Sequence, residues 1–346
     1  MKTEQELNIF ELWEQARLLI TDEVKIPPIV LRVDDSIIGT LGNFSASTGK
    51  AKSKKTFNIC ALVAAALSNS AVLNYSASFP SGKRKILYID TEQSPFHCKR
   101  VLKRILLLAE LSTDIQPENL EFLSLRRYAP KIRLAIIEKA IYQTDGLGLV
   151  VIDGIRDLAY DINSPSEATD LITKLMQWTD ERQIHIHTVL HLNKGDDNTR
   201  GHLGTELNNK AETILQVTKD EFDKNVSSVM AMCIRDMDFE PFAFRINADG
   251  LPELVADYQP KQPASAKVFD YHEVPEEKHR EALESLFANG ESFTYALLIP
   301  KLKSAYSVLG YSFGTNKAKL LKTFLTNKRM ILKEGKVYVY NPGFRY

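Results

Sequence analysis

The chain of 346 residues is long enough for one large domain and a smaller one. Apolar residues make up 44% and charged residues 25%, the composition of an ordinary globular protein rather than of a fibrous or disordered one. Lysine plus arginine and aspartate plus glutamate balance at 44 each, which excludes nucleic-acid affinity driven by net charge. Any such affinity must come from a local excess of cations.

The N-terminus, MKTEQELNIF, is acidic and lacks the apolar core of a signal peptide, and no apolar run reaches 18 residues. We therefore expect a cytoplasmic protein with no membrane partner. The three cysteines, Cys60, Cys98 and Cys233, lie far apart and show no metal-binding spacing. Cys60 and Cys233 fall in apolar runs, so we expect reduced thiols in the core.

Residues 6–20 predict an amphipathic helix with Ile9, Leu12, Ala16 and Leu19 on one stripe. The pair Pro27-Pro28 ends any helix before the main domain. Such a helix can pack on its own chain or on a neighbouring subunit, and the sequence leaves both open.

Residues 43–66 predict a short strand, a lysine-rich loop and an apolar helix, the layout of a phosphate-binding loop with the pattern G-x-x-x-x-G-K-[ST]. If Gly49-Lys50 were the GK pair, Ala51 would stand where a metal-binding hydroxyl is needed. In the second register Gly49 opens the loop, Lys55 is the phosphate lysine and Thr56 binds Mg²⁺. We adopt the second register, which also points the helix N-terminus at the phosphates.

In this register Lys54 stands at the second glycine of the pattern, where a positive φ would be strained for lysine. The residues expected to contact the nucleotide are Gly49, Ala51, Lys52, Ser53, Lys54, Lys55, Thr56 and Phe57. The competing interpretation is a basic surface turn before a core helix.

Two buried strands end in carboxylates. Residues 85–90 lead to Glu92, which is placed to orient the water that attacks the γ-phosphate, unless it is a solvated residue beside a helix cap at Thr91 or Ser94. Residues 149–152 lead to Asp153, the Walker B arrangement that holds Mg²⁺, unless this carboxylate only caps the next turn. Asp157 is a weaker candidate for the metal shell.

Helices are predicted at 95–111, 131–143 and 165–182, with a strand at 120–125 between the first two. His185, His187 and His191 then alternate along a strand. A zinc site lacks a completing ligand, so we expect the first two to be packed or exposed and His191, with Asn193, to sense the γ-phosphate. Residues 195–205 predict a mobile loop carrying Arg200, and antiparallel strands follow at 212–218, 227–235 and 241–247.

The last part of the chain is basic. Residues 256–275 predict a linker, and the segments 276–288, 294–305 and 315–327 predict three helices before a hairpin at Glu334-Gly335. This outline is typical of a winged-helix DNA-binding domain. The side chains expected to contact DNA are Asn316, Lys317, Lys319, Lys322 and Lys336. The alternative is a small protein-binding module with a solvated basic face.

Residues 36–250 resemble the RecA-like ATPase core of the RepA-type and DnaB-type hexameric helicases, and most of all the AAA_25-like ATPases of plasmids and mobile elements. The matching segments are GKAKSKKT (49–56), YIDTE (88–92), LVVID (149–153), LHLNK (190–194) and RGHLGTEL (200–207). The resemblance implies that Glu92 is the catalytic base, that His191 senses the γ-phosphate, and that Arg200 or Arg235 is an arginine finger for a neighbouring subunit. The lysine of the relatives' K-x-R pair is absent from Cys233-Ile234-Arg235.

The sequence therefore predicts an α/β protein with an N-terminal arm (1–28), a RecA-like core with a mostly parallel sheet flanked by helices (29–256), a linker (257–275) and a winged-helix-like domain (276–346). We expect ATP and Mg²⁺ as ligands, DNA as partner and a homo-oligomer, on the resemblance a hexamer. The expected function is a DNA helicase or translocase of a plasmid or mobile element. A DNA-binding switch reset by ATP hydrolysis is the alternative, and a small-metabolite kinase lacks an evident acceptor pocket.

Overall fold

The computed structural model describes residues 8–192, 201–220, 223–256, 258 and 269–344. The chain divides into two compact units, Met1–Pro260 and Lys261–Tyr346, which are described separately. Within the described residues, no helix is both long and apolar enough to cross a membrane.

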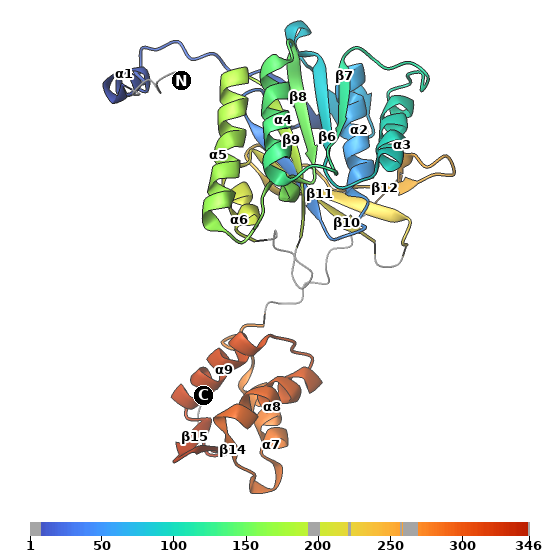
Figure 1. The fold of residues 1–346 in the computed structure, drawn as a ribbon. Coiled ribbons are helices and arrows are strands. Elements are labelled where there is room, and N and C mark those ends of the chain that lie inside the picture. The colour runs from blue at the N-terminus through green and yellow to red at the C-terminus, as the bar shows by residue number, and fades with distance from the viewer. Residues whose placement is uncertain (1–7, 193–200, 221–222, 257, 259–268, 345–346) are drawn as a thin grey trace. The chain divides into compact units, whose positions relative to one another are not determined.

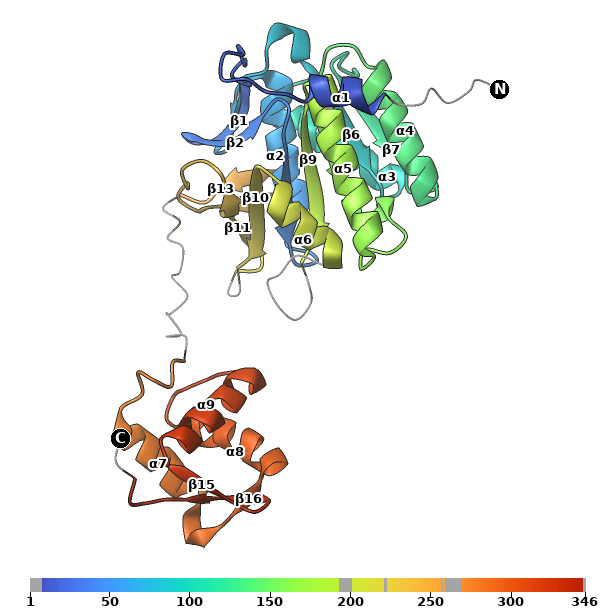
Figure 2. The same ribbon diagram turned by 90° about the vertical axis from the view of Figure 1, so that its left-hand side faces the viewer.

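The first unit is built on a nine-stranded sheet with the order β13-β12-β11-β10-β3-β9-β8-β6-β7 (Figures 1 and 2). The strands from β10 to β7 run parallel, and β11, β12 and β13 extend the sheet antiparallel. This confirms the predicted α/β class with a mostly parallel sheet. The strand bounds are β3 Phe44–Gly49, β6 Lys85–Asp90, β7 Leu120–Ser124, β8 Leu147–Asp153, β9 His185–His191, β10 Thr213–Lys219, β11 Val226–Ile234, β12 Phe242–Ile246 and β13 Pro252–Leu254.

Helices cover both faces of this sheet (Figure 1). One face packs against α2 (Lys55–Ser68) and α3 (Pro95–Leu108), and the other against α4 (Pro130–Gln143), α5 (Pro165–Arg182) and α6 (Gly201–Lys210). Alternate residues of β8 enter the two cores: Leu149 and Val151 face α2 and α3, whereas Val150 and Ile152 join the other core. A strand that is buried on both faces has a continuous run of apolar residues, and this run is the reason that the sequence predicted β8.

A small antiparallel sheet lies beside α2, with the order β2-β1-β5-β4. Its strands are β1 Ile29–Val33, β2 Ser36–Thr40, β4 Ala71–Val72 and β5 Tyr75–Ala77. Strand β5 ends in two small residues, Ser76 and Ala77. Pairing with β1, where Ala77 lies opposite Leu31, holds these small residues extended.

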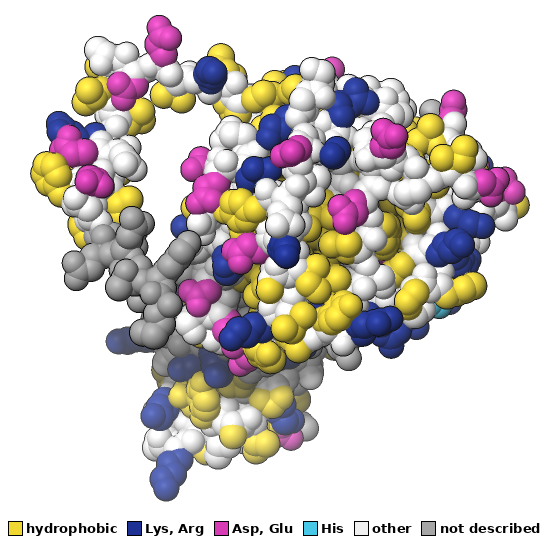
Figure 3. Space-filling model, turned by 45° about the horizontal axis from the view of Figure 1, so that its top comes forward, with side chains coloured by type: hydrophobic (Ala, Val, Ile, Leu, Met, Phe, Trp, Pro, Cys, Tyr) yellow, Lys and Arg dark blue, Asp and Glu magenta, His cyan; other side chains and the backbone are white. Residues whose placement is uncertain are grey.

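The N-terminal helix is shorter than predicted. α1 spans Ile9–Gln15, and the Asn8 side chain caps it by accepting hydrogen bonds from the backbone N–H groups of Phe10 and Glu11. All residues from 8 to 28 are exposed, so no packed apolar face extends the helix beyond one short segment. Hydrophobic and charged side chains stand together on this arm (Figure 3).

Two further expectations are corrected. The predicted mobile loop 195–205 is helical from Gly201 onward, because Leu203 and Leu207 of α6 are buried against the α5 side of the sheet; residues 195–200 lie outside the described part. Cys233 is exposed rather than buried, whereas Cys60 and Cys98 are buried. β11 pairs with β12 only as far as Val229, so its end has a neighbour on one side alone.

In its described residues, 269–344, the second unit has three α-helices and a three-stranded antiparallel sheet. The helices are α7 (Glu276–Leu286), α8 (Tyr295–Val308) and α9 (Thr315–Asn327); the strands are β14 (Phe293–Thr294), β15 (Ile331–Glu334) and β16 (Val337–Tyr340), in the order β14-β16-β15. Its own hydrophobic core includes Phe269 and Val274, two residues of the segment expected to be linker.

Candidate functional site

The loop between β3 and α2 has an unusual backbone. Gly49 ends β3 with a φ of +157°, and a Cβ there would lie 2.3 Å from the Val217 carbonyl oxygen, so only glycine fits. Lys54 immediately precedes α2 in the left-handed region, with φ 68° and ψ 28°. The position that the sequence pattern assigns to a second glycine thus has the positive φ for which glycine is favoured. Lys54 Nζ donates to the Lys224 carbonyl at 3.0 Å, which ties this strained residue to the turn between β10 and β11.

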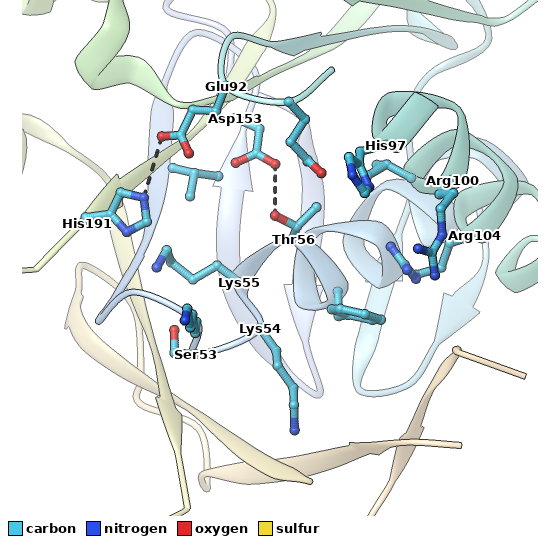
Figure 4. Close-up of a pocket in the computed structure, with 15 residues that line it drawn as sticks. Ser53, Lys54, Lys55, Thr56, Glu92, His97, Arg100, Arg104, Asp153 and His191 are labelled. Carbon is cyan, nitrogen blue, oxygen red and sulfur yellow. Dashed lines mark hydrogen bonds and ion pairs between the residues drawn. The ribbon is translucent and has the colours of Figure 1, made fainter. Parts of the chain in front are cut away.

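A cavity of about 310 Å³ opens above this loop, at the carboxyl ends of the parallel strands (Figure 4). The loop and the start of α2 contribute residues 52–57, whereas Gly49, Lys50 and Ala51 are not among the described residues that line it. The remaining lining comes from the ends of β6, β8 and β9 and from α3: Glu92, Gln93, His97, Arg100, Val101, Arg104, Asp153, Val189 and His191. Chemically different side chains from the loop and five elements therefore meet in one place.

Lys55 is buried at the base of the cavity. Its Nζ donates to the carbonyl oxygens of Gly49, at 2.8 Å, and Lys50, at 2.9 Å. Burial lowers the pKa of Lys55 to about 8, although the carboxylates of Asp153 and Glu92 oppose the shift. Lys50, the lysine of the rejected register, is exposed outside the cavity.

Thr56 and Asp153 form the oxygen-rich wall of the cavity. Thr56 Oγ1 donates to Asp153 Oδ2 at 3.1 Å, and the buried Tyr88 hydroxyl donates to the same oxygen at 3.0 Å. Burial, with the nearby Asp90 carboxylate adding to it, raises the pKa of Asp153 to about 6. A hydroxyl and a carboxylate side by side are hard oxygen ligands of the kind that Mg²⁺ prefers, so these residues fit the metal.

Glu92 is aimed by a turn built on Asp90. The Asp90 carboxylate accepts hydrogen bonds from the backbone N–H groups of Glu92, at 3.0 Å, and Gln93, at 2.7 Å. Glu92 Oε1 lies 3.5 Å from His191 Nε2, and this contact lowers the pKa of Glu92. Ser94 is the N-cap residue of α3, with no side-chain capping bond among the described residues, and Glu92 lines the cavity.

The histidines of β9 separate into two kinds. His185 and His187 are buried and bonded to serines of β3: Ser45 Oγ lies 2.7 Å from a ring nitrogen of each, and Ser47 Oγ lies 2.9 Å from His187 Nε2. Burial lowers the pKa of His187 to about 3, so its ring is neutral. His191, at the strand end, lines the cavity instead, and its buried Nδ1 has no hydrogen-bond partner among the described residues.

Sequence reasoning missed the contribution of α3. His97, Arg100 and Arg104 line the cavity from one face of this helix, and the Arg104 guanidinium lies 3.8 Å from the centre of the Phe57 ring. Their spacing of three and four residues is the signal that would have found them, since it places polar side chains on one helical stripe. The role of Asp90 in positioning Glu92 was also missed, because an aspartate at the end of a strand is common in turns and does not by itself indicate a functional site.

Four other predicted residues are not among the described residues that line the cavity. Asn193 and Arg200 lie outside the described residues. Arg235 follows β11 beside the start of β10, at the opposite end of the parallel strands from the cavity, and its guanidinium donates to the Lys210 carbonyl at 3.1 Å. Asp157 does not line the cavity; its carboxylate accepts from Thr91 Oγ1 at 3.2 Å.

The predicted DNA-contacting residues divide by exposure. Asn316, Lys319 and Lys336 are exposed. Lys317 and Lys322 are half-buried against aromatic rings, with Lys317 Nζ 5.2 Å from the ring centre of Tyr271, so they are less free than the sequence suggested. The buried face of α9 consists of Ala318, Leu321, Phe324 and Leu325.

A parallel sheet with this loop between β3 and α2, and a carboxylate at the end of β8, defines the class of P-loop ATPases. The AAA domain family AAA_25 matches residues 18–197, just over half of the chain, and the chain belongs to this family. AAA domains of this kind occur in RecA-like helicases, and membership supports nucleotide binding and an ATPase. A search of curated proteins finds no match.

Proposed function

We propose that the first unit hydrolyses Mg²⁺-ATP in the cavity above the β3–α2 loop. The observation that carries this proposal is the meeting of Lys55, the Thr56–Asp153 pair and Glu92 in one cavity. Lys55 and the backbone N–H groups of the loop hold the phosphates. Thr56 and Asp153 would hold Mg²⁺, which would supply positive charge to offset that of the phosphates.

Glu92 orients a water for in-line attack on the γ-phosphorus. Because its contact with His191 lowers its pKa, Glu92 is ionised near neutral pH and can accept a hydrogen bond from that water. The new bond joins the water oxygen to phosphorus, the bond to the bridging oxygen breaks with its electron pair leaving on ADP, and the water proton departs through Glu92. His191 contacts Glu92 and senses the γ-phosphate, and the α3 side chains contact the rest of the nucleotide.

We further propose that the second unit is a winged-helix domain that binds DNA. The order α7-β14-α8-α9-β15-β16, with β14 paired to β16, is that of a winged helix, in which α9 would enter the major groove. Residues 278–346 contain twelve lysines and arginines and four glutamates, a net charge of +8 before histidine. Asn316 and Lys319 on the exposed side of α9 would contact bases or phosphates.

Together these parts support a DNA helicase or translocase, which we propose acts as a homo-oligomer, a hexamer by resemblance to the RepA-type and DnaB-type enzymes. A role in the replication or mobilisation of a plasmid or mobile element is proposed from the same resemblance. Arg200 and Arg235 remain the proposed arginine fingers. Since Arg235 lies at the end of the parallel strands away from the cavity of its own subunit, it would have to act on a neighbour.

A DNA-binding switch reset by hydrolysis is the second candidate. The observation that favours it is the hydrogen bond from Lys54, in the phosphate-binding loop, to the Lys224 carbonyl. Through this bond, a change in the loop on ATP binding or hydrolysis could be transmitted to Lys224.

ATP-driven strand displacement separates the two candidates. The full-length chain is mixed with forked DNA and Mg²⁺-ATP, with the Lys55→Ala variant as the inactive control and Lys50→Ala as a matched control from the same loop. The helicase proposal expects displacement by the wild type and Lys50→Ala only. ATP hydrolysis and DNA binding without displacement would favour the switch, and loss from Lys50→Ala equal to that from Lys55→Ala would refute the loop register.

A further inference from the structure

A second hollow adjoins the nucleotide cavity on the other side of Glu92. This open basin of about 630 Å³ shares Glu92 and His191 with the nucleotide cavity. Its other lining residues are Thr91, Asp157 and three arginines, Arg126, Arg133 and Arg156, and we call it the arginine basin. The Glu92–His191 pair, 3.5 Å apart, is therefore a common wall between the two hollows.

One arginine of the basin is fixed in place. Arg133 donates from Nε to the Leu125 carbonyl, from Nη1 to the Asp157 carbonyl and from Nη2 to the Arg126 carbonyl, at 3.1, 2.8 and 2.9 Å. These acceptors are backbone carbonyls, which do not neutralise the guanidinium, and its nearest carboxylate oxygen, on Asp157, is 3.9 Å away. Arg133 thus places a permanent positive charge in the basin.

The other two arginines are accessible. Arg156 is 45% exposed, with Nη1 3.5 Å from Asp157 Oδ1, and Arg126 is exposed where the loop after β7 begins. The basin holds three guanidinium groups against the carboxylates of Glu92 and Asp157, a net charge of +1 without His191. Without Arg126 and Arg156 the net charge would be −1. The sign of the basin therefore depends on these two side chains.

We propose that the arginine basin binds the inorganic phosphate released by hydrolysis, as it leaves the nucleotide cavity past Glu92 and His191. This rests on the proposed ATP hydrolysis. The cleaved phosphate is an anion that must pass the Glu92 carboxylate, which repels it, and guanidinium groups beyond that wall bind phosphate oxygens by charged, two-pronged hydrogen bonds. The basin thereby draws phosphate away from ADP and makes hydrolysis hard to reverse.

The test compares cleavage with release in single turnovers of the full-length chain. ATP cleavage is followed by acid quench, and free phosphate by a fluorescent phosphate sensor. In the Arg126→Gln/Arg156→Gln double variant we expect cleavage within about twofold of wild type and phosphate release slowed by roughly tenfold, because the basin becomes net negative. Arg126→Lys/Arg156→Lys keeps both charges and should restore most of the release rate.

Arg127→Gln is the matched control, since Arg127 neighbours Arg126 but does not line the basin. Normal cleavage with undelayed release in the double glutamine variant overturns the inference, as does an equal delay in Arg127→Gln. Failure of the wild type to cleave ATP refutes the proposed hydrolysis itself and this inference with it. The assays are run with and without single-stranded DNA: a double variant that loses DNA binding but releases phosphate normally would assign the arginines to nucleic-acid phosphates instead.

Discussion

Lys54 shows how a single residue combines strain and a tertiary contact. Its φ of 68° costs a non-glycine residue about 1–2 kcal/mol. Its amino group donates to Lys224 at the same time. We expect Lys54→Ala to be less stable than Lys54→Gly by about 1 kcal/mol, because both lose the hydrogen bond and only glycine relieves the strain. Urea unfolding of the two variants measures this difference, and an alanine variant as stable as the glycine variant would contradict it.

Asp153 should make the unfolding free energy of the metal-free protein depend on pH. Its folded-state pKa of about 6 lies above the ordinary value of 3.8, so its contribution to folding stability is present below the unfolded pKa and is lost as pH rises through 6. Asn at this position never ionises. Without metal, Asp153→Asn should therefore gain about 1 kcal/mol relative to wild type between pH 5 and pH 8.

Denaturant unfolding in the presence of a chelator at both pH values tests this expectation. Added Mg²⁺ should stabilise the wild type at pH 8 and leave Asp153→Asn unchanged. If the difference in unfolding free energy between wild type and Asp153→Asn stayed constant with pH, burial would not raise the pKa of Asp153.

At the scale of elements, the N-terminal arm contributes nothing to the described core. Because all residues from 8 to 28 are exposed, removal of residues 1–26 should leave the thermal midpoint of the first unit within about 1 °C. Differential scanning calorimetry at low protein concentration measures this. A clear loss of stability there would mean that α1 packs on its own chain, whereas a loss only of self-association would mean that it packs on a neighbouring subunit.

The parts of the site predicted from sequence are those with strong local patterns. β6 and β8 are unbroken apolar runs that end in carboxylates, and α2 follows a lysine-rich loop, so Lys55, Thr56, Glu92 and Asp153 were found together. The small sheet was missed because β4 and β5 have two and three residues and exist only through their pairing with each other and with β1. α6 was missed because two glycines mask a helix that tertiary burial of Leu203 and Leu207 stabilises.

At the scale of the molecule, the second unit should bind duplex DNA mainly through phosphates. Each phosphate contact contributes about −0.9 to the slope of log K against log salt. Since Lys317 and Lys322 are engaged with aromatic rings, a fragment of residues 261–346 should show a slope of roughly −2 to −4. Lys319→Ala should flatten the slope and weaken binding across sequences alike, whereas Asn316→Ala should blur discrimination at one base. Fluorescence anisotropy across a salt series measures both, and salt-independent or absent binding would favour a protein-docking module.

In the proposed mechanism, the first unit hydrolyses ATP with water oriented by Glu92. The most direct test of this mechanism is single-turnover hydrolysis of Mg²⁺-ATP by the full-length wild type and Glu92→Gln, with nucleotide affinity measured in parallel. Glu92→Gln should bind ATP as tightly as the wild type and cleave it at least about 100-fold more slowly. Near-normal cleavage by Glu92→Gln, or no cleavage by a wild type that binds ATP, would contradict it.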